Sequence, residues 1–259
     1  MAYSPRSVAV ETALAAGRLL RERLGQVQEI RFKGTVNLVT EVDLESERLI
    51  VGRIQAAFPE HSILSEESGA SSTEQDARYL WVVDPLDGTT NYAHGYPLFA
   101  VSIAFVVDGT PVLGVVYQPV LDELFLAERG AGAYLNGRRI QVSDQETMIM
   151  ALLATGFPYD LERRKRALAH FGRFTTLTRA IRRDGSAALD LCYVAAGRFD
   201  GFWEPELAPW DTAAGALIVR EAGGLVTDYA GRPLTLDSTS CVASNGRLHQ
   251  QILDVLNAD

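Results

Sequence analysis

The fold and the chemistry of this chain depend on one stretch, Trp81-Val-Val-Asp84-Pro85-Leu86-Asp87-Gly88-Thr89-Thr90-Asn91. Its apolar beginning predicts a buried strand with Asp84 at its carboxyl end, and Pro85 stiffens the exit. Asp87 follows three residues later, and Gly88 permits a backbone turn that other residues rarely adopt. The polar run Thr89-Thr90-Asn91 offers N-cap chemistry, so we expect a helix to begin here.

Two kinds of ligand-binding group meet in this turn. The carboxylates of Asp84 and Asp87 suit a hard divalent cation such as Mg²⁺, which prefers oxygen ligands. Backbone N–H groups at the start of the following helix favour a phosphate. A cation site beside an anion site indicates phosphoryl transfer. The alternative is an ordinary Asp-Gly turn with solvated acids, and the buried strand that precedes it argues against that interpretation.

Two further acidic positions strengthen the prediction of a cation site. Glu66-Glu67 follows a short predicted strand at 62–65, and Asp211 stands at the predicted start of a helix. Each has an ordinary explanation, because paired glutamates in a loop are usually solvated and aspartate is a common N-cap. Together with Asp84 and Asp87 they would form a two-metal cluster, with the ions about 4 Å apart.

Around this stretch the chain alternates between helical and extended patterns. An amphipathic helix is expected to begin near Pro5. A second helix is expected after Thr40, whose pairing with Asp43 resembles a capping box, and Pro59 would end this helix. Asp108-Gly109 predicts a hairpin in an antiparallel sheet. Asn136-Gly137 marks a further tight turn. Later helices are predicted at 161–174, 186–196, 210–222 and 250–256, and short strands at 79–84, 98–107, 112–117, 123–127, 180–183, 199–204, 225–227 and 241–243.

Composition excludes several classes of protein. The 259 residues are 47% hydrophobic, which excludes a disordered chain, and the net charge of −9 argues against binding to a nucleic-acid backbone. Cys192 and Cys241 match neither a disulfide framework nor a zinc spacing. The apolar run at 98–107 is far shorter than the roughly 20 residues of a membrane span, and the N-terminus does not resemble a signal peptide. We therefore expect a soluble cytoplasmic protein without membrane contact.

Three motifs occur in order and resemble the signature regions of the inositol monophosphatase family. They are Ser65-Glu66-Glu67-Ser68-Gly69, the stretch from Asp84 to Asn91, and Pro209-Trp210-Asp211-Thr212-Ala-Ala-Gly215. The likeness extends over nearly the whole chain, and bacterial members of the SuhB type are the most similar. Lys33-Gly34 and Asn37-Leu38-Val39-Thr40 resemble the family's N-terminal loop. The resemblance implies a layered αβαβα sandwich of the α/β and α+β classes, a homodimer, and inhibition by Li⁺.

The resemblance also implies a role for each matching residue. Two or three Mg²⁺ ions per site would be held by Glu66, Asp84, the backbone carbonyl of Leu86, Asp87 and Asp211. Thr89 and Glu66 would activate the attacking water, Asp43 would orient the threonine hydroxyl, and no phosphoenzyme would form. The implied substrate-binding residues are Asp87, Gly88, Thr89, Arg182, Gly185, Ser186, Ala187, Glu204, which would bind a hydroxyl, and Asp211.

The same resemblance divides the chain into two halves of one compact catalytic unit. Residues 1–145 would carry most of the metal ligands, and residues 146–259 would carry Asp211 and the substrate pocket. His94 lies near the central stretch, but a surface or packing role is favoured over a catalytic base. The three-residue spacing from Asp84 to Asp87 also differs from the Asp-x-Asp motif of haloacid-dehalogenase phosphatases.

The implied activity is Mg²⁺-dependent hydrolysis of a small phosphorylated polyol or sugar, foremost inositol 1-phosphate to myo-inositol and phosphate. Fructose-1,6-bisphosphatase, histidinol-phosphatase and 3′,5′-nucleoside bisphosphate phosphatase are alternatives within the superfamily. An alternative of another class is a SuhB-like partner of the transcription or ribosome-assembly machinery. The acidic charge argues against direct contact with RNA, which leaves a protein partner for that role.

Overall fold

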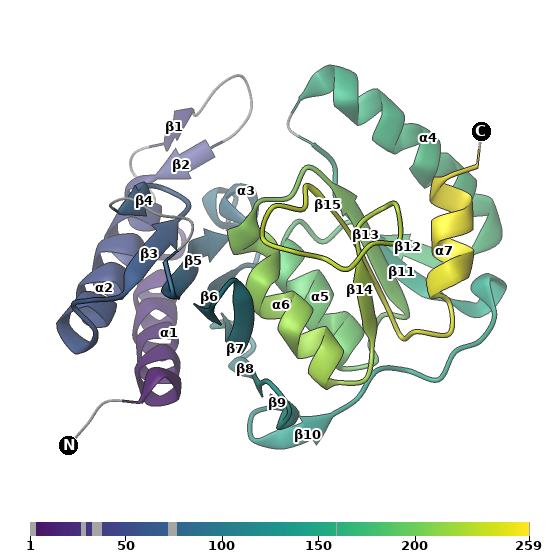
Figure 1. The fold of residues 1–259 in the computed structure, drawn as a ribbon. Helices are drawn as coiled ribbons and strands as arrows, with labels where there is room; N and C mark the ends of the chain where they lie inside the picture. Colours follow the sequence, from purple (N-terminus) through teal and green to yellow (C-terminus); the bar gives the residue numbers. More distant parts are fainter. Residues whose placement is uncertain (1–3, 27–29, 33–37, 72–76, 159, 259) are drawn as a thin grey trace.

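A computed structural model describes residues 4–26, 30–32, 38–71, 77–158 and 160–258. Two sheets lie in separate layers, with one pair of helices between them and another pair on each outer face (Figure 1). This is the αβαβα sandwich expected from the resemblance. Among the described residues, no helix is both long and apolar enough to cross a membrane.

The first outer layer consists of α1 (Pro5–Arg23) and α2 (Glu41–Ala57). Both helices begin where the sequence predicts. Ser4 caps α1 by accepting a hydrogen bond from the N–H of Ser7. Thr40 and Asp43 form the predicted capping box of α2, in which the carboxylate of Asp43 accepts from the N–H of Thr40 at 2.9 Å. A short hairpin, β1 (Ile30–Phe32) and β2 (Leu38–Thr40), leads into α2.

The larger sheet has the strand order β10-β9-β8-β7-β6-β5-β3-β4, and within the described chain its one parallel pair is β3 with β5. The predicted turns at Asp108-Gly109 and Asn136-Gly137 join β6 to β7 and β9 to β10. The strands are β3 (Ser62–Ser65), β4 (Gly69–Ser71), β5 (Tyr79–Asp87), β6 (Ala100–Val107), β7 (Thr110–Gln118), β8 (Glu123–Glu128), β9 (Gly132–Leu135) and β10 (Arg138–Ile140). The sequence pattern did not predict β4, β9 or β10 as strands, and it ended β5 at Asp84, three residues too early.

The middle layer is built from α5 (Ala187–Ala195) and α6 (Pro209–Glu221), with the short α3 (Thr89–Ala93) at its edge. Small side chains allow these helices to lie close to both sheets. An ideal Cβ on Gly114 of β7 would lie only 2.7 Å from the backbone oxygen of Ala214 in α6. The helices therefore share one apolar core with the inner faces of both sheets.

The smaller sheet has the order β12-β11-β13-β15-β14. On its outer face lie α4 (Leu161–Leu177) and α7 (His249–Leu256), where Phe174 stacks on Trp203 with ring centroids 3.9 Å apart. The strands are β11 (Leu152–Thr155), β12 (Ala180–Arg182), β13 (Gly201–Pro205), β14 (Leu225–Thr227) and β15 (Ser240–Ser244). The sequence pattern did not predict β11, which is parallel to both β12 and β13.

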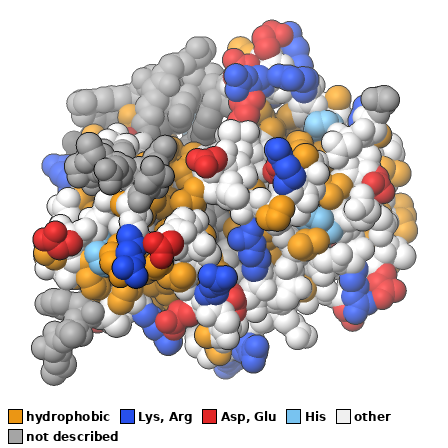
Figure 2. Space-filling model, viewed as in Figure 1, with side chains coloured by type: hydrophobic (Ala, Val, Ile, Leu, Met, Phe, Trp, Pro, Cys, Tyr) orange, Lys and Arg blue, Asp and Glu red, His pale blue; other side chains and the backbone are white. Residues whose placement is uncertain are grey.

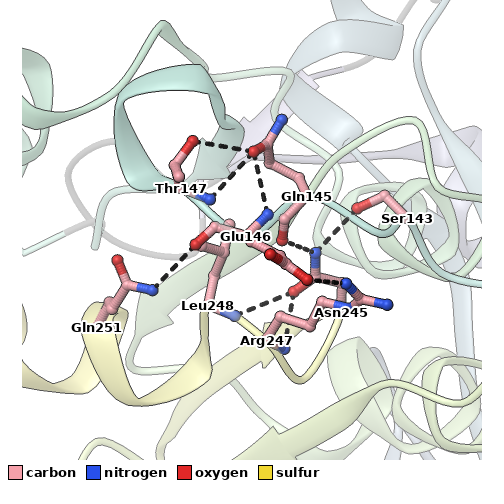
Figure 3. A network of polar contacts seen from close by, with 8 residues as sticks. All are labelled: Ser143, Gln145, Glu146, Thr147, Asn245, Arg247, Leu248 and Gln251. Atoms are coloured by element: carbon pink, nitrogen blue, oxygen red, sulfur yellow. Dashed lines mark hydrogen bonds and ion pairs between the residues drawn. The ribbon is translucent and has the colours of Figure 1, made fainter.

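The connection between the two sheets, from β10 to β11, is anchored to the smaller sheet. It contains a single 3₁₀ turn, η1 (Met148–Met150). The side-chain amide of Asn245 donates to the Ser143 hydroxyl at 3.0 Å and to the Gln145 carbonyl at 2.8 Å, and its oxygen accepts two backbone N–H groups (Figure 3). These bonds hold the crossing segment against the end of β15.

Charges of both signs are mixed on the molecular surface. On the face drawn in Figure 2, Lys and Arg side chains lie among Asp and Glu side chains, although α4 itself is mainly basic. Most surface ion pairs contribute little to stability because water and salt screen them. The packed layers, rather than surface charge, are therefore expected to hold the fold together.

Substitution of Gly114 by Ala tests the close contact between β7 and α6. The added methyl would overlap the backbone of Ala214, and such overpacking typically destabilises a core by about 1–3 kcal/mol. Gly52→Ala is the matched control, because Gly52 is exposed in α2 with nothing within 4 Å of an ideal Cβ. It is expected to stabilise the protein by about 0.5–1 kcal/mol. Urea denaturation measures both, and equal effects would contradict the proposed packing.

Candidate active site

The central stretch forms a bulge at the end of β5. Asp84 pairs with Ser102 and Asp87 with Ala100, so β5 contains one residue more than β6 between these pairs. Bulges are frequent beside active sites because they redirect side chains. The chain then turns at Gly88, whose φ of +95° is accessible to glycine and unfavourable for other residues. Asp84 and Asp87 are consequently both buried at one end of the sheet.

Sheet topology places Glu66 beside these aspartates. Because β3 is parallel to β5, with Ser65 opposite Val83, the residue after β3 lies at the same sheet edge. The N–H of Glu66 donates to the Val83 carbonyl at 3.2 Å. Glu47 of α2 fixes the following loop, since its carboxylate accepts from the Ser65 hydroxyl and from the N–H of Glu67.

The start of α6 brings the fourth acid to the same place. The Ser102 hydroxyl, opposite Asp84 in the sheet, donates to the Trp210 carbonyl at 3.3 Å. Asp211 is not the N-cap of α6 but its third residue, and its carboxylate accepts from the N–H of Ala208 at 2.6 Å. The Pro209-Trp210-Asp211 motif therefore sets the helix start and orients the carboxylate together.

These acids line a cavity of about 210 Å³, which we call the acidic cavity. Its walls comprise Glu66, Asp84, Leu86, Asp87, Gly88, Thr89, Glu206, Ala208, Trp210 and Asp211. Burial raises the pKa of Asp84 well above its ordinary value, and three neighbouring carboxylates raise it further. Burial and the charge of Asp87 likewise raise the pKa of Asp211. Like charges in a low-dielectric site repel, so this cavity is electrostatically unfavourable without a cation.

The donor chemistry of the acidic cavity fits a hard divalent cation. Acidic residues predominate in its wall, which also contains Leu86, and oxygen ligands are those that Mg²⁺ prefers. Among the described residues, no three His, Cys, Asp or Glu side chains already converge in metal-ligand geometry. The cavity therefore has the chemistry of a cation site without a preformed coordination sphere.

Asp87 joins the two halves of the chain. Its carboxylate accepts from the Ser186 hydroxyl at 2.6 Å and from the N–H of Ala188 at 2.7 Å, both at the start of α5. Burial raises the pKa of Asp87 to about 6, although these two hydrogen bonds act in the opposite direction. The carboxylate thus lies between the acidic cavity and the helix that carries the C-terminal part of the site.

Thr89 and Asp43 form a buried pair at the edge of the acidic cavity. The Thr89 hydroxyl lies 2.9 Å from Oδ1 of Asp43 and 3.2 Å from the Leu86 carbonyl. The expectation that Thr89-Thr90-Asn91 supplies the cap of α3 is wrong, since Gly88 is the N-cap and makes no side-chain bond. The hydroxyl is instead directed to a carboxylate whose pKa burial raises.

A second cavity of about 250 Å³ adjoins the first, and we call it the leaving-group cavity after the substrate pocket that the family resemblance implies. It shares Asp87, Gly88, Glu206 and Asp211 with the acidic cavity. Its other walls are Thr90, Gly156, Phe157, Pro158, Asp160, Arg183, Gly185, Ala187, Asp190, Glu204, Pro205 and Leu207. Burial raises the pKa of Glu204 to about 8. A Cβ on Gly156 would lie 1.9 Å from the Glu204 carboxyl, so a glycine is needed there.

The structure brings most of the predicted site residues to these two cavities, but in one case the adjacent residue lines the cavity in place of the predicted one. Arg182 is exposed at the end of β12, whereas Arg183 lines the leaving-group cavity. Ser186 reaches the site through its bond to Asp87. His94 is exposed and lines neither cavity. The predicted loop residues Lys33, Gly34 and Asn37 lie outside the described residues.

Sequence reasoning missed Glu206, which lines both cavities. Its φ of +62° is unusual for a residue other than glycine, and its carboxylate forms an ion pair with Arg163 of α4 at 3.1 Å. No local pattern in the sequence indicated this conformation. A salt bridge between distant residues becomes visible only after folding brings α4 to the mouth of the site.

Comparisons with known proteins identify the family of this chain. The model of the inositol monophosphatase family matches residues 4–258. An inositol-1-monophosphatase of Synechocystis is 46% identical over 97% of this chain and 88% of its own length. The Nus factor SuhB of Pseudomonas aeruginosa is 45% identical over 96% of this chain and 94% of its own length.

Solved structures are similar to this chain in fold. The extragenic suppressor protein SuhB of Bartonella henselae superposes with a TM-score of 0.93 at 42% identity, covering 98% of both chains. The inositol monophosphatase of Anabaena gives a TM-score of 0.85 at 44% identity, covering 96% of this chain and 94% of that one. Sequence, site geometry and fold therefore lead to one conclusion: the chain belongs to the inositol monophosphatase family.

Proposed function

We propose that this protein hydrolyses a small phosphomonoester, foremost inositol 1-phosphate, by direct attack of water on phosphorus. The observation that carries the proposal is the adjoining pair of cavities, which share Asp87, Gly88, Glu206 and Asp211. A phosphoryl group at the shared wall would place its ester oxygen toward the leaving-group cavity. At about 250 Å³, that cavity is of a size that suits a single polyol or sugar ring.

Water activation is assigned to Thr89, Asp43 and Glu66. Because the Thr89 hydroxyl donates to the Asp43 carboxylate at 2.9 Å, its oxygen lone pairs remain available to a water proton. Glu66 lines the same cavity and offers a second acceptor for that water. Such positioned proton acceptors typically accelerate a reaction about 10²–10⁴-fold.

The phosphoryl group and the cation would share the acidic cavity. We assign the backbone N–H groups of Gly88 and Thr89 to the phosphoryl oxygens, and Glu66, Asp84, the Leu86 carbonyl, Asp87 and Asp211 to two or three Mg²⁺ ions. When bound, Mg²⁺ neutralises charge on phosphoryl oxygens and lowers the pKa of water beside it. The family as a whole is generally metal-dependent, which supports this assignment.

A second candidate function is a binding role. Relatives named Nus factor SuhB, at 45% and 44% identity, favour it. The isosteric variant Asp87→Asn separates the two roles, because it alters a carboxylate of the cavity and leaves the surface unchanged. A cellular phenotype that disappears together with turnover supports the phosphatase role, and one that survives without turnover supports the binding role.

A phosphate-release assay with Mg²⁺ over four substrates tests the proposed reaction. Inositol 1-phosphate is expected to be hydrolysed faster than fructose 1,6-bisphosphate, histidinol phosphate and 3′-phosphoadenosine 5′-phosphate. Added Li⁺ is expected to inhibit. If none of the four releases phosphate with Mg²⁺ present, the catalytic interpretation is wrong, and a preference for another substrate corrects the assignment within the superfamily.

Replacement of Thr89 tests the assigned water activation. Thr89→Val keeps the shape of the side chain but removes the hydroxyl, so kcat is expected to fall about 10²-fold or more. Thr89→Ser retains the hydroxyl and should remain within about tenfold of the original enzyme. Equal activity of the Val and Ser variants would show that this hydroxyl takes no part in the reaction.

Mg²⁺ is expected to stabilise the folded protein by relieving repulsion among the buried aspartates. A ligand at a hundred times its Kd contributes about 2.7 kcal/mol, which a thermal shift assay detects. Asp84→Asn, the matched variant, should unfold at a higher temperature than the original protein without Mg²⁺ and should gain less from the ion. A Mg²⁺-induced rise in Tm of equal size in both proteins would contradict the assigned cation site.

A further inference from the structure

Asp190 lines the leaving-group cavity and carries a buried oxygen atom that the structure leaves unpaired. It lies in the first turns of α5, is 1% exposed, and lines the cavity together with Glu204 and Arg183. Its Oδ1 has no hydrogen-bond partner. Among the described residues, one other buried side-chain atom shares this condition, the hydroxyl of Tyr229. Buried polar atoms are almost always paired in folded proteins, so each exception requires a reason.

The local structure gives Asp190 no role in holding α5. The cap of this helix is Ser186, whose hydroxyl accepts from the N–H of Leu189 at 3.4 Å. The N–H of Ala188 is already taken by Asp87. Within the described part of the chain, Asp190 belongs to none of the salt bridges. The carboxyl group is therefore held in the cavity wall with an acceptor still to be satisfied.

From this position we infer that Asp190 is a specificity-determining residue, whose Oδ1 accepts a hydrogen bond from a hydroxyl of the leaving alcohol. This inference rests on the proposed function. The phosphoryl end would occupy the wall shared with the acidic cavity, so the alcohol would extend toward Asp190 and Glu204. A polyol offers several hydroxyl donors to these two carboxyl groups, and an aromatic alcohol without further hydroxyls offers none.

The enzyme would then discriminate between substrates by whether the leaving alcohol donates a hydrogen bond to Asp190. A site built to bind a hydroxyl rejects an analogue that lacks it, because its own polar group stays buried and unpaired. Glu204 does not satisfy Asp190, since Oδ1 of Asp190 has no hydrogen-bond partner among the described residues although both side chains line the cavity. The structure thus assigns two acceptors to the leaving group, and Asp190 is the one that remains unpartnered in the wall.

Substrate discrimination measures this role directly. With Mg²⁺ saturating, kcat/KM is determined for inositol 1-phosphate and for p-nitrophenyl phosphate, which lacks a hydroxyl on its leaving group. Asp190→Ala is expected to lower kcat/KM at least tenfold for inositol 1-phosphate, mainly through KM, and less than twofold for p-nitrophenyl phosphate. Asp190→Asn, which keeps one acceptor oxygen, should lose less. An equal loss on both substrates, or no loss on either, would overturn the assignment.

Asp184→Asn is the matched control for charge. Asp184 is a half-buried acid near Asp190 that does not line the cavity. Its variant should therefore change kcat/KM for neither substrate by more than twofold.

Thermal unfolding supplies a second readout. Asp190→Asn should keep Tm because it preserves the size of the side chain and one acceptor oxygen, whereas a purely structural carboxylate predicts a lower Tm. Histidinol phosphate tests whether Asp190 binds a hydroxyl or an ammonium group, because its leaving alcohol carries an ammonium group and no further hydroxyl. A larger loss of kcat/KM in Asp190→Ala on this substrate than on inositol 1-phosphate would contradict the inference.

Binding of myo-inositol distinguishes failure of this inference from failure of the proposed function. If the original enzyme hydrolyses no polyol phosphate, the proposed function is wrong. Calorimetric titration of the Mg²⁺-loaded enzyme with myo-inositol then still tests Asp190. At least tenfold weaker binding to Asp190→Ala than to the original protein supports the hydroxyl contact, and unchanged binding, or no binding to either protein, refutes it.

Discussion

The carboxylate of Asp87 is the contact on which the rest of the site depends. It is delivered by the bulge of β5, and it accepts from the Ser186 hydroxyl and the N–H of Ala188 at 2.6 and 2.7 Å. Because those donors begin α5, one buried group connects the larger sheet with the middle helix layer. Asp87 lines both cavities, so this connection sets how the two cavities lie relative to each other.

The same region holds several buried acids whose pKa values are raised by burial and mutual repulsion. A fold optimised only for stability would not gather like charges at the end of a buried strand. Under the proposed function, a cation would neutralise these acids and a phosphate would bind to that cation. Part of the net charge of −9 is therefore concentrated in one functional cavity instead of being spread as solubilising surface charge.

Sequence alone predicted the buried strand that contains Asp84 and the turn at Gly88, although it ended the strand three residues too early, because apolar runs and turn residues act locally. The family resemblance added Asp43, whose carboxylate contacts Thr89 across 46 positions of the chain. Long-range geometry remained beyond reach. Three features depend on packing between distant elements, which no local pattern encodes. They are the left-handed backbone at Glu206, the presence of Arg183 rather than Arg182 in the cavity wall, and short strands such as β11.

The stereochemistry of phosphoryl transfer tests the central claim most directly. Inositol 1-phosphate made chiral at phosphorus with sulfur and oxygen isotopes is hydrolysed in isotopically labelled water, and the configuration of the released thiophosphate is determined. Direct attack by water positioned by Thr89 and Asp43 predicts inversion, with one solvent oxygen in the product. Retention of configuration would reveal a phosphoenzyme formed on one of the cavity's side chains and would contradict the account.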